Sequence, residues 1–383
     1  MTTTIGLMAD PGMPAIMAAR IREDLVEELT RRVDDHAEWR IEVVDEVVPL
    51  DADGSVDLIR WVGETEARHD WDMVFYLTDL PRYERGRPVV AEVTRRHSAA
   101  VVFLPALGVR RVGRGLVETM ARLVGHLHRG SVDVGPGGRT ETQDPEHPEA
   151  LNALVPLSET ASESAEAVEQ VTATGIWAVP RLLAGMVQSN RPGRLPKAMT
   201  ASAAAASAAG AYGVFFGSIW TLAADMGVDR LAVVTVLSIA GMASWLIATN
   251  GLWARRTEWS SRRWAAMDNV ATVITVAVAV MMVYAGLFLL LLIASVLVVP
   301  PHYLTETLGT EAGAEHYVKL SWLAASLGML AGAIGSSFDD DDAIRNATYS
   351  LRESERRALH RELDEREAER RERGEREFEE GGS

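Results

Sequence analysis

Five charged residues have the type and position to bind an anionic ligand, because each lies just after a short apolar run that reads as a β-strand. They are Asp10, Asp79, Arg82, Arg110 and Arg111. Arginines beside the start of a helix hold phosphate or carboxylate through charge and free backbone N–H groups. A structural alternative stays open, in which the aspartates cap or brace turns and the arginines are solvated or face lipid headgroups.

The elements that must position these residues alternate between strand and helix patterns. We expect strands at 4–9, 39–48, 73–78 and 99–104, and helices at 15–33, 56–69, 87–96 and 110–128. Such alternation favours a parallel sheet with helices on both faces, a flavodoxin-like or Rossmann-like α/β domain. Ligands of these sheets bind outside the carboxyl ends of the strands, where the five residues are expected to lie.

No stretch carries a complete catalytic or metal-binding signature. The chain contains no cysteine, which excludes disulfides, thiol catalysis and cysteine metal ligands. No glycine fingerprint follows the first strand, so no nucleotide cofactor is predicted. The histidines His36, His69, His97, His126 and His128 are scattered. We therefore predict no metal site and assign no catalytic residue.

The formal net charge of −16 argues against a general affinity for nucleic acid, because the phosphate backbone attracts basic surfaces. We expect no nucleic-acid partner.

Four long apolar runs dominate the second half of the chain. They span 199–224, 231–254, 270–299 and 320–338, and none contains Lys, Arg, Asp or Glu. About 20 apolar residues are needed for a helix to cross about 30 Å of hydrocarbon. The runs predict a four-helix transmembrane bundle, with the lipid bilayer as its partner.

Most of the basic residues that flank these runs lie on one side, and the other side contains only Arg230 and Lys319. Arg181, Arg191, Arg194 and Lys197 precede the first run, and Arg255, Arg256, Arg262 and Arg263 separate the second from the third. Since basic loops stay on the cytoplasmic side, the sequence predicts a multi-pass protein of the cell inner (plasma) membrane with both termini cytoplasmic. No ionisable group lies inside a run, which disfavours a channel or pump.

Small residues four apart let membrane helices approach closely. The first run contains Gly213 and Gly217, and the last contains Gly328 and Gly332. We expect the first and last runs to pack together, either within one subunit or across a homo-oligomer.

The composition divides the chain into five parts. We predict a cytoplasmic α/β domain at 1–130, an acidic flexible linker at 131–175, a juxtamembrane or interfacial helix at 176–198, the transmembrane helices at 199–338, and a charged cytoplasmic helical tail at 339–383.

Several segments resemble a family of actinobacterial four-span membrane proteins, whose members are sometimes labelled 5,10-methylene-tetrahydrofolate dehydrogenase. The segments are Val74–Pro81, Arg87–Ala91, Val101–Gly108, Leu183–Arg194 and the charge-free runs. The label would imply NADP as cofactor and a catalytic lysine a few residues after a tyrosine. The chain offers only Lys197 and Lys319, at a membrane span and in an outer loop, so the lysine is missing from the α/β domain.

These observations favour a noncatalytic membrane protein whose cytoplasmic domain binds a small anionic ligand or a cytoplasmic protein. Two alternatives remain from other classes: an enzyme of folate or nucleotide chemistry tethered to the membrane, and a transport component.

Overall fold

The computed structural model describes residues 2–44, 46–51, 54, 56, 61–63, 65, 68–84, 86–132, 157–160, 168–254, 262–359, 361–362 and 366. The chain divides into two compact units. The first comprises Met1–Ser189, Thr257–Trp259 and Ser350–Ser383, and the second comprises Asn190–Arg256 and Ser260–Tyr349.

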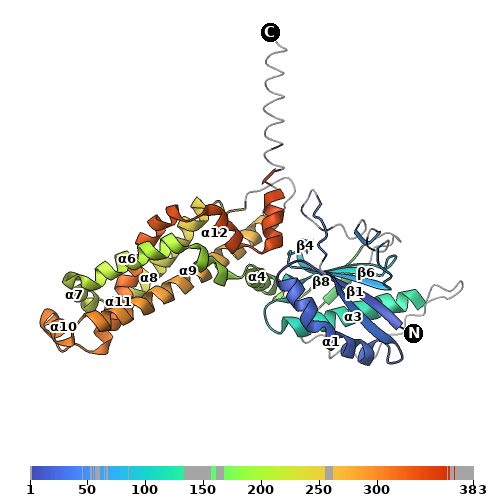
Figure 1. Cartoon of the computed structure of the whole chain (residues 1–383), viewed down its shortest axis with the longest axis horizontal. Helices are drawn as coiled ribbons and strands as arrows, with labels where there is room; N and C mark the ends of the chain where they lie inside the picture. Colours follow the sequence, from blue (N-terminus) through green and yellow to red (C-terminus); the bar gives the residue numbers. More distant parts are fainter. Residues whose placement is uncertain are drawn as a thin grey trace, which may run out of the picture. The chain divides into compact units, whose positions relative to one another are not determined.

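The first unit is an α/β domain built on one sheet (Figure 1). Its elements are β1 (Thr2–Ala9), α1 (Met13–Arg32), β2 (Glu38–Val44), β3 (Met73–Thr78), β4 (Tyr83–Glu84), β5 (Arg87–Thr94), β6 (Ala99–Phe103), η1 (Leu104–Leu107), α3 (Val112–Val132), β7 (Leu157–Thr160), β8 (Glu169–Ala173) and α4 (Ala178–Ser189). Residues 351–359 add a C-terminal helix to this unit.

The sheet of the described residues has the strand order β2-β1-β3-β6-β5-β8-β7, with β4 paired to β5. Strands β2, β1, β3 and β6 are parallel to one another, and β5, β8 and β7 add antiparallel pairs. The sheet is therefore mixed, with the predicted parallel arrangement confined to one half.

Both faces of the parallel half are covered. Helix α1 buries Met17, Ile21, Leu25 and Leu29 at four-residue spacing, and it packs beside α3 along the sheet (Figure 1). The opposite face carries a cluster that includes Met8, Val74, Tyr76, Val101 and Trp61. Because successive strand side chains point to opposite faces, β1, β3 and β6 contribute to both layers and are buried along almost their whole length.

Two predictions for this unit are wrong. Residues 87–96 were expected to be helical, but β5 occupies Arg87–Thr94 and pairs antiparallel with β6. Its β-branched residues Val89, Val90 and Val93 are fully or almost fully buried, which suits a strand inside a sheet.

The predicted linker at 131–175 contains β7 and β8, which extend the sheet beyond β5. Residues 133–156 and 161–167 of that range lie outside the described residues.

Helix α4 belongs to the α/β domain rather than forming a separate juxtamembrane element. It packs against η1 and β5, and Leu182 is fully buried. A Cβ atom at Gly185 would come within 2.0 Å of the Pro105 carbonyl oxygen. The missing side chain of Gly185 therefore allows the two backbones to approach.

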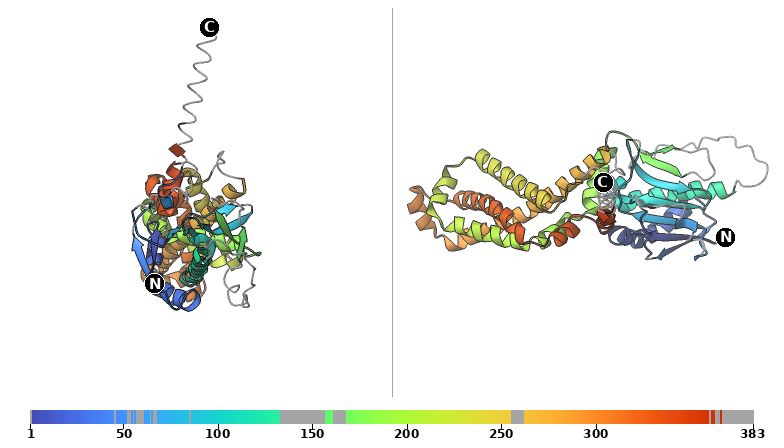
Figure 2. Two further views of the ribbon diagram at one scale, coloured as in Figure 1. Left: turned by 90° about the vertical axis from the view of Figure 1, so that its right-hand side faces the viewer. Right: turned by 90° about the horizontal axis from the view of Figure 1, so that it is seen from above.

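The second unit is helical. Its elements are η3 (Pro192–Arg194), α5 (Leu195–Ala198), α6 (Thr200–Phe215), α7 (Gly217–Asp225), α8 (Val228–Thr249), α9 (Arg262–Val298), α10 (Pro301–Leu308), α11 (Ala314–Gly335), η4 (Ser336–Phe338) and α12 (Asp341–Thr348). Figure 2 shows its long helices running alongside one another.

Three helices among the described residues are long and apolar enough to span a membrane: Val228–Thr249, Ala265–Val298 and Ala314–Phe338. The first predicted span is different, because α6 and α7 are bent by 86° at a break beside Phe216. This bent pair is either a broken span or a re-entrant loop, so the predicted straight helix over 199–224 is not present.

Helices α6 and α11 pack closely through small residues. A Cβ atom at Gly328 would lie 2.5 Å from the Ala206 carbonyl oxygen, and one at Gly332 would lie 3.0 Å from the Ser202 carbonyl oxygen. A Cβ atom at Gly213 would touch Ala324 at 3.4 Å. Gly217 lies beyond the break, where its nearest neighbour is Thr307. The structure therefore places three of the four predicted packing glycines at one interface within the chain.

The acidic run after α11 caps two helices. Asp339 accepts hydrogen bonds from the backbone N–H groups of Ala201 at 2.7 Å and Ser202 at 3.2 Å, in the first turn of α6. Asp340 accepts from Asp342 and Ala343 at the start of α12. Each carboxylate satisfies N–H groups that have no partner inside their own helix.

Candidate functional site

The carboxyl ends of β1 and β3 lie side by side at one edge of the sheet, the edge where parallel α/β sheets bind ligands. Asp10 directly follows β1, and its backbone N–H donates to the Leu77 carbonyl at 2.9 Å. Gly12, with φ 106°, then turns the chain into α1. Asp10 is 0% exposed, so its carboxylate needs partners from the protein.

Those partners form what we call the Asp10 cluster, which consists of Asp10, Val48, Tyr76 and Arg352. The Tyr76 hydroxyl donates to Asp10 Oδ1, and Arg352 Nε lies 3.0 Å from the same oxygen. The hydroxyl accepts from the Val48 backbone N–H at 3.3 Å, and Arg352 Nη2 donates to the Val48 carbonyl. Arg352 is 3% exposed and Tyr76 is 0% exposed, so these contacts are shielded from water.

Burial is the largest influence on the pKa values of Asp10 and Tyr76. It raises the pKa of the Asp10 carboxyl above its usual value, although the Arg352 charge and hydrogen bonds from Thr78 and Tyr76 act in the opposite direction. Burial also raises the pKa of the Tyr76 hydroxyl, and the neighbouring Asp10 charge adds to that effect. The hydroxyl therefore remains protonated and serves as a hydrogen-bond donor.

Arg352 comes from the C-terminal helix, and the chain separates it from Val48 by 304 residues. Its guanidinium occupies the space beside Asp10 where the sequence predicts an external ligand. The structure thus assigns the Asp10 carboxylate an internal partner.

Arg82 lies in a second polar group on the antiparallel side of the sheet. Its Nε is 3.2 Å from Glu92 Oε1, and its Nη2 is 3.8 Å from Glu84 Oε2. Gln170 also donates to Glu92 at 3.2 Å. Burial raises the pKa of the Glu92 carboxyl, opposed by the Arg82 charge and by Gln170. Arg82 therefore pairs with the buried Glu92 and the half-exposed Glu84, and the structure does not place it in the Asp10 cluster.

Asp79 is 3% exposed and follows β3 in a tight turn. The turn is stabilised by the Leu80 backbone N–H, which donates to Thr78 Oγ1 at 3.0 Å. The Thr78 side chain therefore braces this turn, and the roles considered for Asp79 stay predictions.

Arg110 and Arg111 are exposed in the turn between η1 and α3. Two left-handed residues shape this turn, Gly108 at φ 82° and Arg111 at φ 53°. The first turn of α3 contains no acidic residue. The two arginines are therefore presented beside the positive end of a helix.

Arg181 of α4 packs its aliphatic stem on the same turn. A Cβ atom at Gly108 would lie 2.5 Å from Arg181 Cγ. The Nη1 atom of Arg181 is buried and has no hydrogen-bond partner within the part of the chain that the structure describes. A buried guanidinium N–H without an acceptor is costly, so Arg181, whose aliphatic stem contacts Gly108, carries an unsatisfied donor. We call this group the arginine turn, residues 108–111 with Arg181.

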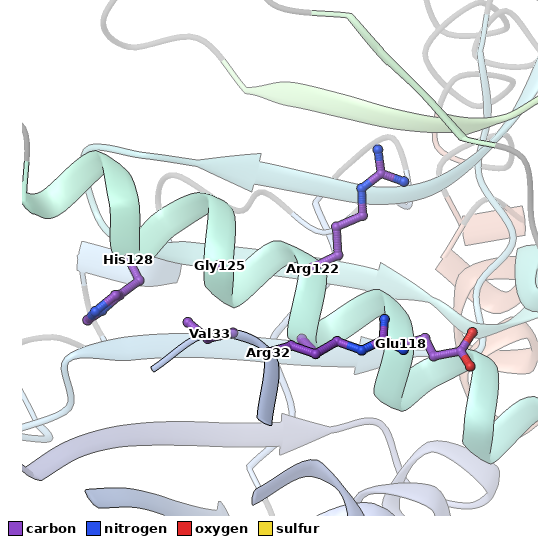
Figure 3. Close-up of a pocket in the computed structure, with 7 residues that line it drawn as sticks. Arg32, Val33, Glu118, Arg122, Gly125 and His128 are labelled. Carbon is purple, nitrogen blue, oxygen red and sulfur yellow. The ribbon is translucent and has the colours of Figure 1, made fainter. Parts of the chain in front are cut away.

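A shallow groove of about 200 Å³ lies between α3 and the end of α1 (Figure 3). It is lined by Arg32, Val33, Glu118, Ala121, Arg122, Gly125 and His128. Figure 3 shows Arg122 pointing away from Arg32, and Arg32 Nε already lies 2.6 Å from Glu28. The cationic groups do not converge on one point, so the groove has no evident ligand chemistry.

Among the described residues, no group of three His, Cys, Asp or Glu side chains is placed to hold a metal ion.

Sequence reasoning missed Tyr76, Arg352 and Arg181. Tyr76 carried a weak signal, because a hydroxyl inside the apolar run Val74–Leu77 needs a polar partner when buried. Arg352 lies in a charged helix that was expected to be solvated, and no local pattern relates it to Asp10. Arg181 was interpreted as one of the basic residues that set the membrane orientation.

No family model, curated protein or solved structure matches this chain, so the functional argument rests on the residues and their geometry.

Proposed function

We propose that the chain is a noncatalytic, multi-pass protein of the cell inner membrane whose cytoplasmic α/β domain binds a small anionic ligand at the arginine turn. Four apolar segments cross the bilayer in this proposal, with α6 and α7 together forming the first. Both termini lie in the cytoplasm.

The exposed surface of the helical unit supports the membrane part of the proposal. Large apolar side chains are exposed along its helices, and Val236, Leu297 and Ile334 are 65%, 84% and 71% exposed. Contiguous apolar surface of this kind is expected to face lipid rather than water. The basic residues Arg191, Arg194 and Lys197 just before α6 favour the cytoplasmic side for that end.

The observation that carries the binding part is the unsatisfied, buried Nη1 of Arg181. A phosphate or carboxylate oxygen is the acceptor that would satisfy a guanidinium donor best, because such charge-assisted bonds are about twice as strong as neutral ones. Arg110, Arg111 and the start of α3 add positive potential at the same turn. The Asp10 cluster is a less suitable place for an anion, since it already contains a buried carboxylate.

A thermal-shift screen of the full chain in detergent tests this proposal. The probes are inorganic phosphate, NADP and folate. A ligand at 100 times its dissociation constant stabilises the native state by about 2.7 kcal/mol, which raises the unfolding midpoint. We expect the increase to disappear in Arg110→Ala/Arg111→Ala and in Arg181→Met, which keeps an apolar stem against Gly108.

Arg114→Ala is the matched control, because Arg114 lies near the start of α3, next to the arginine turn, but its Nε is 3.8 Å from Glu118. It should retain the shift. An unchanged shift in the double variant would place the anion elsewhere. If no anion shifts the wild-type midpoint, the proposal of an anionic ligand is wrong and a protein partner becomes the better explanation.

A further inference from the structure

The C-terminal helix, residues 351–359, buries two charged residues, exposes Leu351 and leaves Leu359 half-buried. Arg352 and Glu353 are 3% and 5% exposed, whereas Leu351 is 53% exposed. Ala358 is also exposed. A helix that belongs to a permanent core buries its apolar stripe, so this helix is held on the domain by charged and polar contacts.

Arg352 contacts the domain at one place, the sheet edge beside Asp10. Its Nη2 donates a hydrogen bond to the Val48 carbonyl, and its Nε forms an ion pair with Asp10 Oδ1 at 3.0 Å without hydrogen-bond geometry. Its Nη1 donates to Glu355 of its own helix at 2.8 Å. The receiving site thus offers one carboxylate and one carbonyl to a planar group with several donors, which matches guanidinium better than ammonium.

The remaining charged residues of the helix mainly pair within it. Glu353 accepts from Arg356 at 2.9 Å and from Arg357 at 3.0 Å. These pairs are three and four residues apart and stabilise the helix itself. Arg352 links the helix to the sheet edge through the Asp10 carboxylate and the Val48 carbonyl.

We expect the attachment of the C-terminal helix to the domain to be reversible, because the net free energy of the Arg352–Asp10 ion pair is small. Removing two charges from water costs nearly as much as their attraction returns, so a buried ion pair contributes little net stability. No large apolar side chain of the helix's first turn supplements the pair, since Leu351 is exposed.

We propose that the carboxyl edge of β1 and β3 is a binding site for a guanidinium group, and that the C-terminal helix is a detachable latch that occupies it through Arg352. When the latch leaves, Asp10, Tyr76 and the Val48 carbonyl form an acidic site for an arginine side chain. The site is separate in residues and in charge from the arginine turn, so either proposal can fail without the other.

Hydrogen exchange of the full chain in detergent micelles, followed by mass spectrometry, tests the latch. We expect Arg352→Ala to accelerate exchange in residues 354–359 by about ten-fold or more, the factor that corresponds to about 1.4 kcal/mol. Exchange in α1 serves as the reference for the folded domain and should be unchanged. The matched control Leu351→Ala truncates an exposed side chain of the same helix and should change exchange by only about two-fold.

Two results would overturn the latch. If Arg352→Ala leaves exchange in residues 354–359 as in the wild type, the helix is held by other contacts. If exchange in α1 accelerates equally, Arg352 supports the whole domain and the helix is not detachable.

Rescue by a small cation tests the guanidinium site independently. Ethylguanidinium added to Arg352→Ala should fill the space left by the side chain and protect the β1 amides against exchange. Ethylammonium at the same concentration should protect them less, because it lacks the planar donor arrangement. Equal protection by both cations, or protection by neither, would contradict a site that recognises guanidinium.

Discussion

The buried Asp10 carboxylate requires a cationic partner and a hydrogen-bond donor from the protein. It lies at the end of β1 with no exposed surface, and its ionised form depends on the Arg352 guanidinium 3.0 Å away. Tyr76 donates a further hydrogen bond. Loss of the Tyr76 hydroxyl would remove one of these hydrogen bonds from a buried carboxylate, which is a costly change.

The raised pKa of Asp10 predicts a pH-dependent stability. The folded state holds the Asp10 proton more tightly than the unfolded chain does, so this contribution is fully present below the ordinary pKa of 3.8 and is lost as pH rises through the raised pKa. The wild type should therefore lose free energy of unfolding relative to Asp10→Asn as pH rises, by at most about 1.4 kcal/mol per pH unit.

Pulse proteolysis in urea measures this difference. The urea midpoints of the wild type and Asp10→Asn are compared at several pH values between about 4 and 8, the interval above the ordinary aspartate pKa. A midpoint difference that stays constant over this interval would contradict the raised pKa.

At the scale of elements, close backbone approach through glycine recurs in both units. Gly185 lets α4 lie on η1 in the α/β domain, and Gly328 lets α11 lie on α6 in the helical unit. In each case the atom that a Cβ would meet is a backbone carbonyl oxygen, which does not move aside as the end of a flexible side chain would. The helices would have to separate instead.

Gly328→Ala is therefore expected to destabilise the helical unit by about 1–3 kcal/mol, the usual cost of overpacking. Gly286→Ala is the matched control, because no atom lies within 4 Å of a Cβ at Gly286 of α9. That change should be neutral or stabilising by up to about 1 kcal/mol, since alanine has the higher helix propensity. Unfolding in mixed micelles with increasing sodium dodecyl sulfate measures both, and equal behaviour would refute the role of Gly328.

At the scale of the whole molecule, the open question of topology concerns the bent pair α6 and α7. If the pair crosses the bilayer, the turn at Asp229 and the turn at Glu311 lie outside and both termini lie in the cytoplasm. If the pair is re-entrant, Asp229 stays on the side of Arg194 and the C-terminus moves to the outside. The two arrangements differ in which residues face which compartment.

Single cysteines distinguish the two arrangements, and the cysteine-free chain needs no background substitution. We expect Asp229→Cys and Glu311→Cys to react with a membrane-impermeant maleimide in intact cells. Arg194→Cys should react only after permeabilisation, because basic flanks favour the cytoplasmic side. All three positions are exposed in the structure. Protection of Asp229→Cys in intact cells would favour the re-entrant loop.

Local patterns were sufficient for several features. Strands β1, β3 and β6 and helices α1 and α3 lie close to their predicted positions, because their apolar residues repeat with the period of their own element. The long apolar helices α8, α9 and α11 were equally apparent, since length and lack of charge are properties of composition.

Features that depend on distant partners required the tertiary structure. Residues 87–94 became a strand because β6 and β8 pair with them on both sides, and strand preference depends on such neighbours. The break beside Phe216 falls inside a run without charged residues, so length and composition alone did not locate it.

The candidate sites followed the same division. The sequence by itself located polar residues at the carboxyl ends of the strands, because strand ends can be found from apolar periodicity. Only the tertiary structure decided which partner each residue has, since it brings Arg352 to Asp10 and Arg181 to Gly108. Contacts between residues that are hundreds of positions apart leave no periodic signal in the sequence. Here they determine that the Asp10 carboxylate has a cationic partner and that Arg181 Nη1 lacks an acceptor.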